Sequence, residues 1–179
     1  NFYGRYTQNQ TKSTFSKGEL LKALQYEEPS STARYLRYRY RFANYPTRFK
    51  ICSYPLVVII EPTSVCNLKC QFCFISDPRL SKNREINGFM SMETFVRIAD
   101  EAGSQQLDSM VFTGRGEPTL NKNIGKMICY ARASGILDIK LNTNALVLND
   151  PLIHEILDGD PDVVVFSVDD ASPEVYNDL

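Results

Sequence analysis

Several features that mark whole classes of protein are scarce in this sequence. The formal net charge is only -1 at pH 7, so no strong field of one sign favours nucleic acid or an anionic membrane as a partner. The longest apolar run, Leu56 to Ile60, is far too short to cross a bilayer, and we expect no membrane partner. The first residues are polar and lead into no apolar stretch, which predicts no secretion signal and a cytoplasmic location.

The sequence also lacks the cysteine pattern of a disulfide-bonded protein. Its five cysteines are an odd number, and three of them, Cys66, Cys70 and Cys73, lie within eight residues. Clustered cysteines without a secretion signal are typical of a metal site in a reducing compartment. The other two, Cys52 and Cys129, are expected to be buried and structural.

The first 50 residues differ in composition from the rest, so we expect an N-terminal extension over residues 1–50 and a core domain over residues 51–179. Ser16 and Glu19 form a capping-box pattern at the start of a predicted helix, residues 17–25. In residues 33–42 arginines alternate with aromatic residues, which favours an amphipathic helix with its aromatic side chains packed and its arginines in solvent. The same residue types stack on nucleic acid, so an RNA-associated role stays open as an alternative.

From residue 56 onward, short apolar runs alternate with helical patterns. Strands are predicted at residues 56–60, 110–113, 138–142 and 163–168. Helices are predicted at residues 91–102, 121–134 and 150–159, and a further helix is predicted to open at Ser172. Gly103 is expected to end the first of these helices, and Asn121 and Asp150 are expected to cap the next two. This order predicts an α/β protein whose parallel sheet is built from about four βα units.

Unusual segments follow each predicted strand. The cysteine cluster follows the first strand, and the glycine-rich residues 114–118 follow the second. Asn142, Thr143 and Asn144 end the third strand, and Ser167 and Asp169 end the fourth. The carboxyl ends of parallel strands form one edge, where α/β proteins place their active sites, so we expect these four segments to converge.

Three thiolates on one short loop can ligate three corners of a cubic [4Fe–4S] cluster. Complete ligation normally uses four cysteines, so one iron would stay open to a ligand from outside the protein, as catalytic metal sites require. The alternative is a zinc site made by the three cysteines and the only histidine, His154, which lies in a predicted helix away from the strand ends. The loop that follows the cysteines, around Lys82 and Arg84, is expected to form a solvated cover over the site.

These residues resemble the signature of the radical S-adenosylmethionine (SAM) enzymes, Cys-x3-Cys-x2-Cys with an aromatic residue, here Phe72, before the last cysteine. The stretch from Ile60 to Cys70 resembles the subgroup that carries a C-terminal SPASM or twitch domain, and the resemblance covers about residues 54–179. It implies a partial parallel (β/α) TIM-like barrel. The sequence begins without methionine and stops as a helix begins, so we expect an N-terminal fragment whose core domain is incomplete at its C-terminus.

The resemblance also implies roles for individual residues. Cys66, Cys70 and Cys73 would ligate three irons, and the amino and carboxylate groups of SAM would chelate the fourth. The remaining residues would bind SAM, with Phe72 near the adenine, Gly114, Gly116 and Glu117 near the amino group, Thr143 and Asn144 near the ribose or carboxylate, and Ser167 and Asp169 at a further polar contact. Glycines allow backbone carbonyls to approach a ligand closely, and a glutamate accepts charge-assisted hydrogen bonds from an ammonium. Arg115 replaces a glycine that is common at this position in the family, and its side chain is expected either to point away or to meet a carboxylate.

The activity that the resemblance implies is enzymatic. A reduced cluster would pass one electron to SAM, which would break into methionine and a 5′-deoxyadenosyl radical, and this radical would abstract hydrogen from a peptide, protein or sugar substrate. The electron would come from a reductant protein of the flavodoxin or ferredoxin type. No residue stands out as a catalytic acid, base or radical carrier. Two alternatives stay open: a glycyl-radical activase of the same family, and a non-catalytic metal-binding or RNA-associated module.

Overall fold

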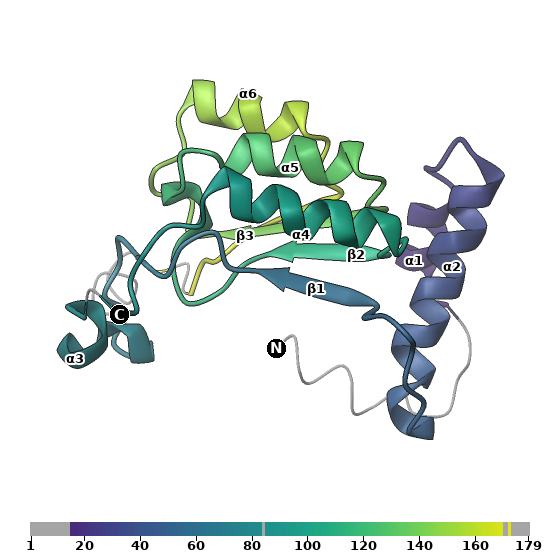
Figure 1. Ribbon diagram of the computed structural model, residues 1–179, viewed down its shortest axis with the longest axis horizontal. Coiled ribbons are helices and arrows are strands. Elements are labelled where there is room, and N and C mark those ends of the chain that lie inside the picture. The colour runs from purple at the N-terminus through teal and green to yellow at the C-terminus, as the bar shows by residue number, and fades with distance from the viewer. Residues whose placement is uncertain (1–14, 84, 170–171, 173–179) are drawn as a thin grey trace. The chain divides into compact units, whose positions relative to one another are not determined.

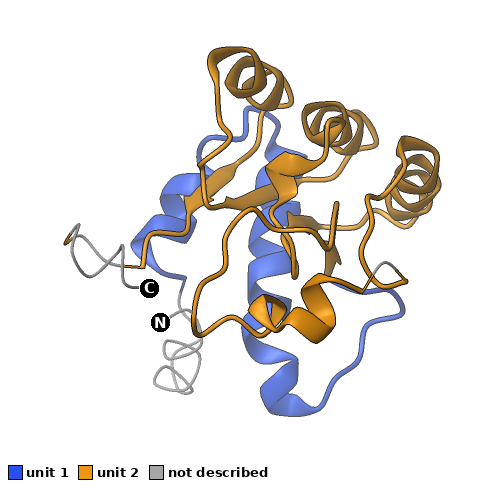
Figure 2. Ribbon diagram, turned by 90° about the vertical axis from the view of Figure 1, so that its left-hand side faces the viewer, with its two compact units in different colours: residues 1–56 blue, residues 57–179 orange. Residues whose placement is uncertain are grey.

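The computed structural model describes residues 15–83, 85–169 and 172 of the chain. The chain divides into two compact units, Asn1–Leu56 and Val57–Leu179, which Figure 2 shows in different colours. Arg84 and the helix predicted to open at Ser172 fall outside the described residues. Within the described ranges, no helix combines the length and the apolar character that crossing a membrane requires.

The first unit is helical. It contains α1 (Lys17–Ala23), α2 (Pro29–Asn44) and a short 3-10 helix, η1 (Pro46–Arg48). α1 begins with the predicted capping box: the Ser16 hydroxyl accepts the backbone N–H of Glu19 at 3.2 Å, and the Glu19 carboxylate accepts the backbone N–H of Ser16 at 2.8 Å. The helix ends earlier than predicted, where the hydroxyl of Thr32 in α2 donates to the carbonyl of Ala23 at 3.1 Å.

The Arg- and Tyr-rich stretch forms α2 as predicted, but one of its arginines does not point freely into solvent. Tyr35 and Tyr38 are buried. Arg39 forms an ion pair with Glu19 of α1 at 2.7 Å, and its guanidinium lies 5.4 Å from the centre of the Phe42 ring. A planar guanidinium can stack on an aromatic ring while it keeps a carboxylate partner. Arg39 therefore joins the two helices, and the prediction that the arginines face solvent is wrong at this position.

The second unit is a four-stranded parallel sheet with its long helices on one face (Figure 1). The strands lie in sequence order, β1 (Val57–Ile60), β2 (Ser109–Phe112), β3 (Asp138–Thr143) and β4 (Val163–Phe166). The connecting helices are α4 (Met92–Ser104), α5 (Ile124–Ala133) and α6 (Asp150–Asp158). Shorter helical segments are η2 (Phe74–Ser76), α3 (Pro78–Ser81) and η3 (Pro118–Leu120). The predicted α/β class is confirmed, and the arrangement is consistent with a partial TIM-like barrel.

The strands have a buried face under the helices and an open face on the other side. Phe112 and Leu141 are fully buried on the helix side, where the Phe112 ring lies 5.7 Å from that of Phe95 in α4. Ile59 of β1 points to the open face and is 66% exposed. Side chains alternate along a strand, so Asn142, which follows the buried Leu141 in β3, also lies on the open face.

Gly103 lies inside α4 rather than after its end. The helix runs one residue further, to Ser104. A Cβ atom at position 103 would lie 2.4 Å from the carbonyl oxygen of Ser134, the C-cap residue of α5. The glycine therefore allows two helices to approach closely, and the prediction that it ends the helix is wrong.

Two predicted helix caps are also wrong. Asn121 is buried, and its Nδ2 donates to the carbonyls of Pro62 at 2.7 Å and Met90 at 3.0 Å, so it joins two loops while α5 begins only at Ile124. At α6 the cap is Asn149, whose side chain accepts a backbone N–H of the first turn at 3.0 Å. Asp150 lies within that first turn, where an acidic side chain favours the helix through its dipole.

Candidate functional site

The three clustered cysteines lie on the loop between β1 and α4. None of them forms a disulfide, and each is partly exposed. The backbone N–H of Cys73 donates to the carbonyl of Cys70 at 3.0 Å, and the hydroxyl of Ser76 donates to the same carbonyl at 2.8 Å. Burial raises the pKa of the Cys70 thiol, and its acidic neighbour Asp169 raises it further. Asp169, from the end of β4, is therefore close enough to the cysteine loop to affect Cys70.

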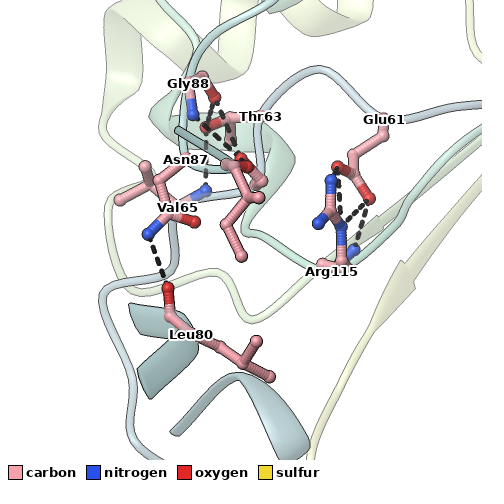
Figure 3. Close-up of polar contacts among 9 residues, drawn as sticks. Glu61, Thr63, Val65, Leu80, Asn87, Gly88 and Arg115 are labelled. Carbon is pink, nitrogen blue, oxygen red and sulfur yellow. Dashed lines mark hydrogen bonds and ion pairs between the residues drawn. The ribbon is translucent and has the colours of Figure 1, made fainter. Parts of the chain in front are cut away.

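The cysteine loop, residues 65–87, is fastened at its base (Figure 3). The hydroxyl of Thr63, just before the loop, donates to the carbonyl of Gly88 at 2.8 Å. The hydroxyl of the buried Ser64 accepts the backbone N–H of Gly88 at 2.9 Å and donates to the carbonyl of Ile86 at 2.9 Å. The segment predicted to cover the site is thus tied at one end to the start of the cysteine loop.

The segment after β2 packs its backbone directly against the cysteine loop. A Cβ atom at Gly116 would lie 2.3 Å from the carbonyl oxygen of Thr63 and 2.5 Å from that of Val65. The backbone N–H of Glu117 donates to the carbonyl of Val65 at 2.9 Å. Only a glycine at position 116 permits this close approach. The backbone segments that follow β1 and β2 therefore pack directly against each other.

Arg115, next to Gly116, forms an ion pair with the end of β1 (Figure 3). Its guanidinium donates to both carboxylate oxygens of Glu61 at 2.7 to 3.0 Å, and its backbone N–H donates to the same carboxylate at 3.0 Å. These hydrogen bonds hold the pKa of Glu61 below its usual range, against the opposing effect of partial burial. A Cβ atom at Gly114 would lie 2.6 Å from the Glu61 side chain, so the pair leaves space only for glycine there. Of the two expected orientations of Arg115, the one that meets a carboxylate is confirmed, and Glu61 is the partner.

Glu117 is a buried carboxylate that joins the ends of β2 and β3. Glu117 is only 3% exposed to solvent. Its Oε1 accepts hydrogen bonds from the backbone N–H of Thr119 and from the hydroxyls of Thr119 and Thr143, at 3.1, 2.6 and 2.6 Å. Its Oε2 accepts the backbone N–H of Asn144 at 2.7 Å. The structure therefore brings Glu117, Thr143 and Asn144 together, and their role toward a cofactor stays a prediction.

Asn144 connects the end of β3 to the cysteine loop. Its Nδ2 donates to the Oδ1 of Asn67 at 2.9 Å and lies 4.0 Å from the Sγ of Cys66. Its Oδ1 accepts the backbone N–H of Leu146 at 3.1 Å, which fixes the direction of the amide. A side-chain amide from the third strand end thus lies beside the first predicted iron ligand.

The other predicted site residues lie at the same edge and are more exposed. The backbone N–H of Ser167 donates to the carbonyl of Thr143 at 2.8 Å, which places Ser167 beside the end of β3. Asp169 is exposed, and its charge acts on Cys70. Phe72, on the cysteine loop, is 65% exposed. The four strand ends therefore converge, while the binding roles of Phe72, Ser167 and Asp169 stay predictions.

The three free thiols on one loop are ligands of the type that a [4Fe–4S] cluster takes. Within the described ranges, no three His, Cys, Asp or Glu side chains are placed to hold one ion. A tetrahedral zinc site needs its sulfurs about 3.8 Å apart, because each Zn–S bond is about 2.3 Å long. His154, which the zinc alternative requires, lies in α6, where its Nδ1 is 2.6 Å from the carbonyl oxygen of Asp150. Both the zinc alternative and the [4Fe–4S] assignment therefore stay predictions at this point.

The sequence profile of the Radical SAM superfamily matches residues 60–179. This chain belongs to the Radical SAM superfamily. The matched range begins at the end of β1 and includes all four converging strand ends. The superfamily consists of enzymes whose cofactors are a [4Fe–4S] cluster and SAM, and the three free thiols on one loop fit such a cluster.

Curated relatives of this radical SAM chain carry different names. It is 31% identical to the tungsten-containing aldehyde ferredoxin oxidoreductase cofactor-modifying protein of Pyrococcus furiosus, over 62% of this chain and 30% of that protein. It is 30% identical to GTP 3′,8-cyclase of Desulforamulus reducens, over 67% of this chain and 36% of that protein. It is 30% identical to Fe-coproporphyrin III synthase of Methanosarcina barkeri, over 68% of this chain and 29% of that protein. The chain thus spans about a third of the length of these relatives.

A solved structure shares the fold of this radical SAM chain. BtrN, determined in complex with AdoMet and 2-DOIA, superposes with a TM-score of 0.56 at 18% sequence identity. The match covers 71% of this chain and 51% of BtrN. At this identity the likeness supports the partial-barrel fold, and it assigns no substrate.

Proposed function

We propose that this chain binds and cleaves SAM, with Cys66, Cys70 and Cys73 as the protein ligands of a [4Fe–4S] cluster. When bound, the cluster supplies the electron that breaks SAM into methionine and a 5′-deoxyadenosyl radical, which abstracts hydrogen from the substrate. One observation carries the proposal: the three free thiols lie on a loop that Gly116 contacts through its backbone and that Asn144 reaches at 4.0 Å from Cys66 Sγ.

The residues at the ends of β2 and β3 would bind the amino acid part of SAM. Among the described residues, Oε2 of Glu117 accepts one hydrogen bond whereas Oε1 accepts three, so the ammonium of SAM is expected at Oε2. Gly114 and Gly116 would let backbone carbonyls approach the same group. Glu117 holds Thr143 and Asn144 in place, and these two would contact the ribose or the carboxylate.

Three exposed residues would complete the SAM site. Phe72 would lie near the adenine, and its exposure leaves its ring free to stack on a flat base. Ser167 and Asp169 would supply a further polar contact from the end of β4. The position of this strand end supports the role, because the backbone N–H of Ser167 donates to the carbonyl of Thr143 at 2.8 Å.

The substrate and partners of the whole protein are proposed from the family resemblance. We propose a member of the SPASM or twitch subgroup that acts on a peptide, protein or sugar and receives its electron from a flavodoxin- or ferredoxin-type protein. Residues 1–50 would be an extension, and residues 51–179 would belong to the SAM-binding core. The stretch from Ile60 to Cys70 supports the subgroup, and the free cysteines support a reducing compartment such as the cytoplasm.

The proposal is tested by loading the chain with iron and sulfide without oxygen. The wild type should hold about four irons and a similar amount of sulfide. It should also convert SAM to 5′-deoxyadenosine when a reductant is present. Cys70→Ala should lose both properties, whereas Cys52→Ala and Cys129→Ala, at cysteines outside the loop, should keep them.

Two results would contradict the proposal. A Cys70→Ala variant that still forms 5′-deoxyadenosine would remove Cys70 from the ligand set. Zinc bound without sulfide would favour the non-catalytic metal-binding module instead.

A further inference from the structure

Asn142, near the end of β3, carries a buried polar atom without a partner. Its Oδ1 is inaccessible to solvent and accepts no hydrogen bond from the part of the chain that the structure describes. Its Nδ2 donates to the Oγ1 of Thr113 at 3.4 Å, which is long for a hydrogen bond. If the amide were flipped, Nδ2 would take the place of Oδ1 and would itself lack a partner. One polar atom is therefore without a partner in either orientation. Buried polar atoms of this kind destabilise a fold and are rare in native proteins.

Asn142 belongs to a polar row on the open face of the sheet. The strand register pairs Phe112 with Leu141, so the next residues, Thr113 and Asn142, are neighbours across β2 and β3. The backbone N–H of Thr113 donates to the last carbonyl of β1, and Glu61 therefore continues the row on that strand. The row lies at the carboxyl ends of the strands, where the cysteine loop and the glycine-rich segment begin.

The neighbours of Asn142 in this row and in the chain have partners. Glu61 has Arg115, Thr143 has Glu117, and Asn144 has Asn67. The buried amide oxygen of Asn142 is thus an exception within a network that is otherwise satisfied.

Arg132 carries the one other buried side-chain atom without a hydrogen-bond partner in the described ranges, its Nε, which lies 3.9 Å from the Asp160 carboxylate. Its terminal nitrogens make four hydrogen bonds, to Ile136, Leu137, Asp160 and Asp162, at the opposite end of β3 and β4. Arg132 therefore has a structural task that accounts for its burial. Asn142 has no comparable set of bonds, and its position at the strand ends points to a ligand.

We propose that Asn142 is a cofactor-binding residue whose side-chain oxygen accepts a hydrogen bond from an N–H or O–H group of bound SAM. The inference rests on the proposed function, because it takes SAM to bind at these strand ends. SAM offers such donors in its ammonium, its ribose hydroxyls and its adenine amine. The position supports this assignment, since Asn142 directly precedes Thr143 and Asn144, and Asn144 reaches the Sγ of Cys66.

Asn142→Val and Asn142→Thr form an isosteric pair that tests the inference. Both side chains suit a strand, and only the threonine keeps an oxygen that can accept a hydrogen bond. The valine variant without SAM should melt at the wild-type temperature or above it, because it no longer buries an unpartnered carbonyl. Its dissociation constant for SAM, measured by equilibrium dialysis on the cluster-loaded protein, should rise roughly three- to tenfold. The threonine variant should bind SAM with an affinity between those of the wild type and the valine variant.

Ser109→Ala is the matched control for the loss of a polar group from the sheet. Ser109 is buried at the start of β2, and its hydroxyl donates to Asp138 at 3.0 Å, so it has a partner within the protein. This variant should melt below the wild type and bind SAM with unchanged affinity.

The inference is overturned if Asn142→Val binds SAM as tightly as the wild type. It is also overturned if this variant loses as much stability as Ser109→Ala, or if the valine and threonine variants bind SAM equally well. A wild-type protein that binds no SAM would instead contradict the proposed function, so the two failures are distinguishable.

Discussion

The ion pair between Glu61 and Arg115 should make part of the stability depend on pH. Hydrogen bonds from Arg115 lower the pKa of Glu61 in the folded state. A carboxylate of this kind stabilises the fold fully above its unfolded pKa, about 4.3, and the stabilisation is lost as the pH falls through the lower folded value. Arg115→Gln should therefore reduce the free energy of unfolding at pH 7 and have a smaller effect near pH 3. Urea unfolding of the metal-free protein at both pH values measures this.

A second arginine provides the control for this prediction. Arg97 is exposed on α4, and Arg97→Gln should change the free energy of unfolding little at either pH. An effect of Arg115→Gln that is the same at pH 3 and pH 7 would contradict the role assigned to Glu61.

Glu117→Gln should destabilise the second unit. Four hydrogen-bond donors converge on this buried carboxylate, and an amide has only one oxygen to accept them. The free energy of unfolding should fall by about 2–3 kcal/mol, because at least one buried donor loses its acceptor. Glu101→Gln, at an exposed position of α4, should change it by less than about 0.5 kcal/mol. Equal effects of the two variants in urea unfolding would show that the four hydrogen bonds to Glu117 do not stabilise the fold.

Individual site residues differ in how far the sequence could predict them. The cysteines and glycines could be found because their spacing is local. The partner of Arg115 could not, because Glu61 lies 54 positions away and the contact depends on how β1 and β2 pair. The unpartnered amide of Asn142 was likewise hidden, since residue type and strand periodicity do not reveal which polar atoms find a partner.

The base of the cysteine loop should control how firmly the loop holds its metal. Ser64 provides both a donor and an acceptor there, and Ser64→Ala would leave the backbone N–H of Gly88 without its partner. We expect a loss of about 1–3 kcal/mol in the free energy of unfolding. We also expect faster release of iron to a chelator and faster amide exchange at Gly88.

Ser91→Ala is the control for the loop base, because Ser91 caps α4 through the backbone N–H of Thr94 at 3.1 Å. It should reduce stability by about 1 kcal/mol and leave iron release unchanged. If Ser64→Ala released iron no faster than Ser91→Ala, the base of the loop would have no part in holding the metal.

Two helical glycines should respond to alanine in opposite directions. At Gly103 in α4 a methyl group would lie 2.4 Å from the carbonyl oxygen of Ser134, so Gly103→Ala should lower the free energy of unfolding by about 1–3 kcal/mol. At Gly18 in α1 no atom lies within 4 Å of such a group, so Gly18→Ala should raise it by up to about 1 kcal/mol. Urea unfolding of both variants measures the contrast, and a stabilising Gly103→Ala would contradict close packing of α4 on α5.

The elements were easier to predict than their ends. Apolar runs and helical periodicity are local and dominant, so each strand and long helix of the second unit was found. Gly103 and Asn121 misled the prediction because each serves a contact with a distant segment, to Ser134 and to Pro62 and Met90. Capping patterns record only local preference, and tertiary contacts override it.

For the whole molecule, the site exists only when the sheet is folded. The cysteine loop, Glu117 and Asn144 come from different strand ends, and the register of the strands brings them together. A ligand that binds only this folded arrangement must stabilise it by mass action. The metal site and the fold should therefore be coupled.

Loading the cluster should raise the melting temperature of the wild-type chain. A gain of 1 kcal/mol corresponds to roughly 2–4 °C for a chain of 150–250 residues, so a rise of at least about 2 °C is expected in anaerobic thermal unfolding. Cys66→Ala should abolish the rise because it removes a ligand, and Cys129→Ala, at a cysteine of α5, should keep it.

SAM at about 100 times its dissociation constant should add a further increase in melting temperature, equivalent to about 2.7 kcal/mol in the free energy of unfolding. Identical melting of loaded and metal-free wild type would mean that the fold does not organise the thiols, and the convergence of the four strand ends would then serve another purpose.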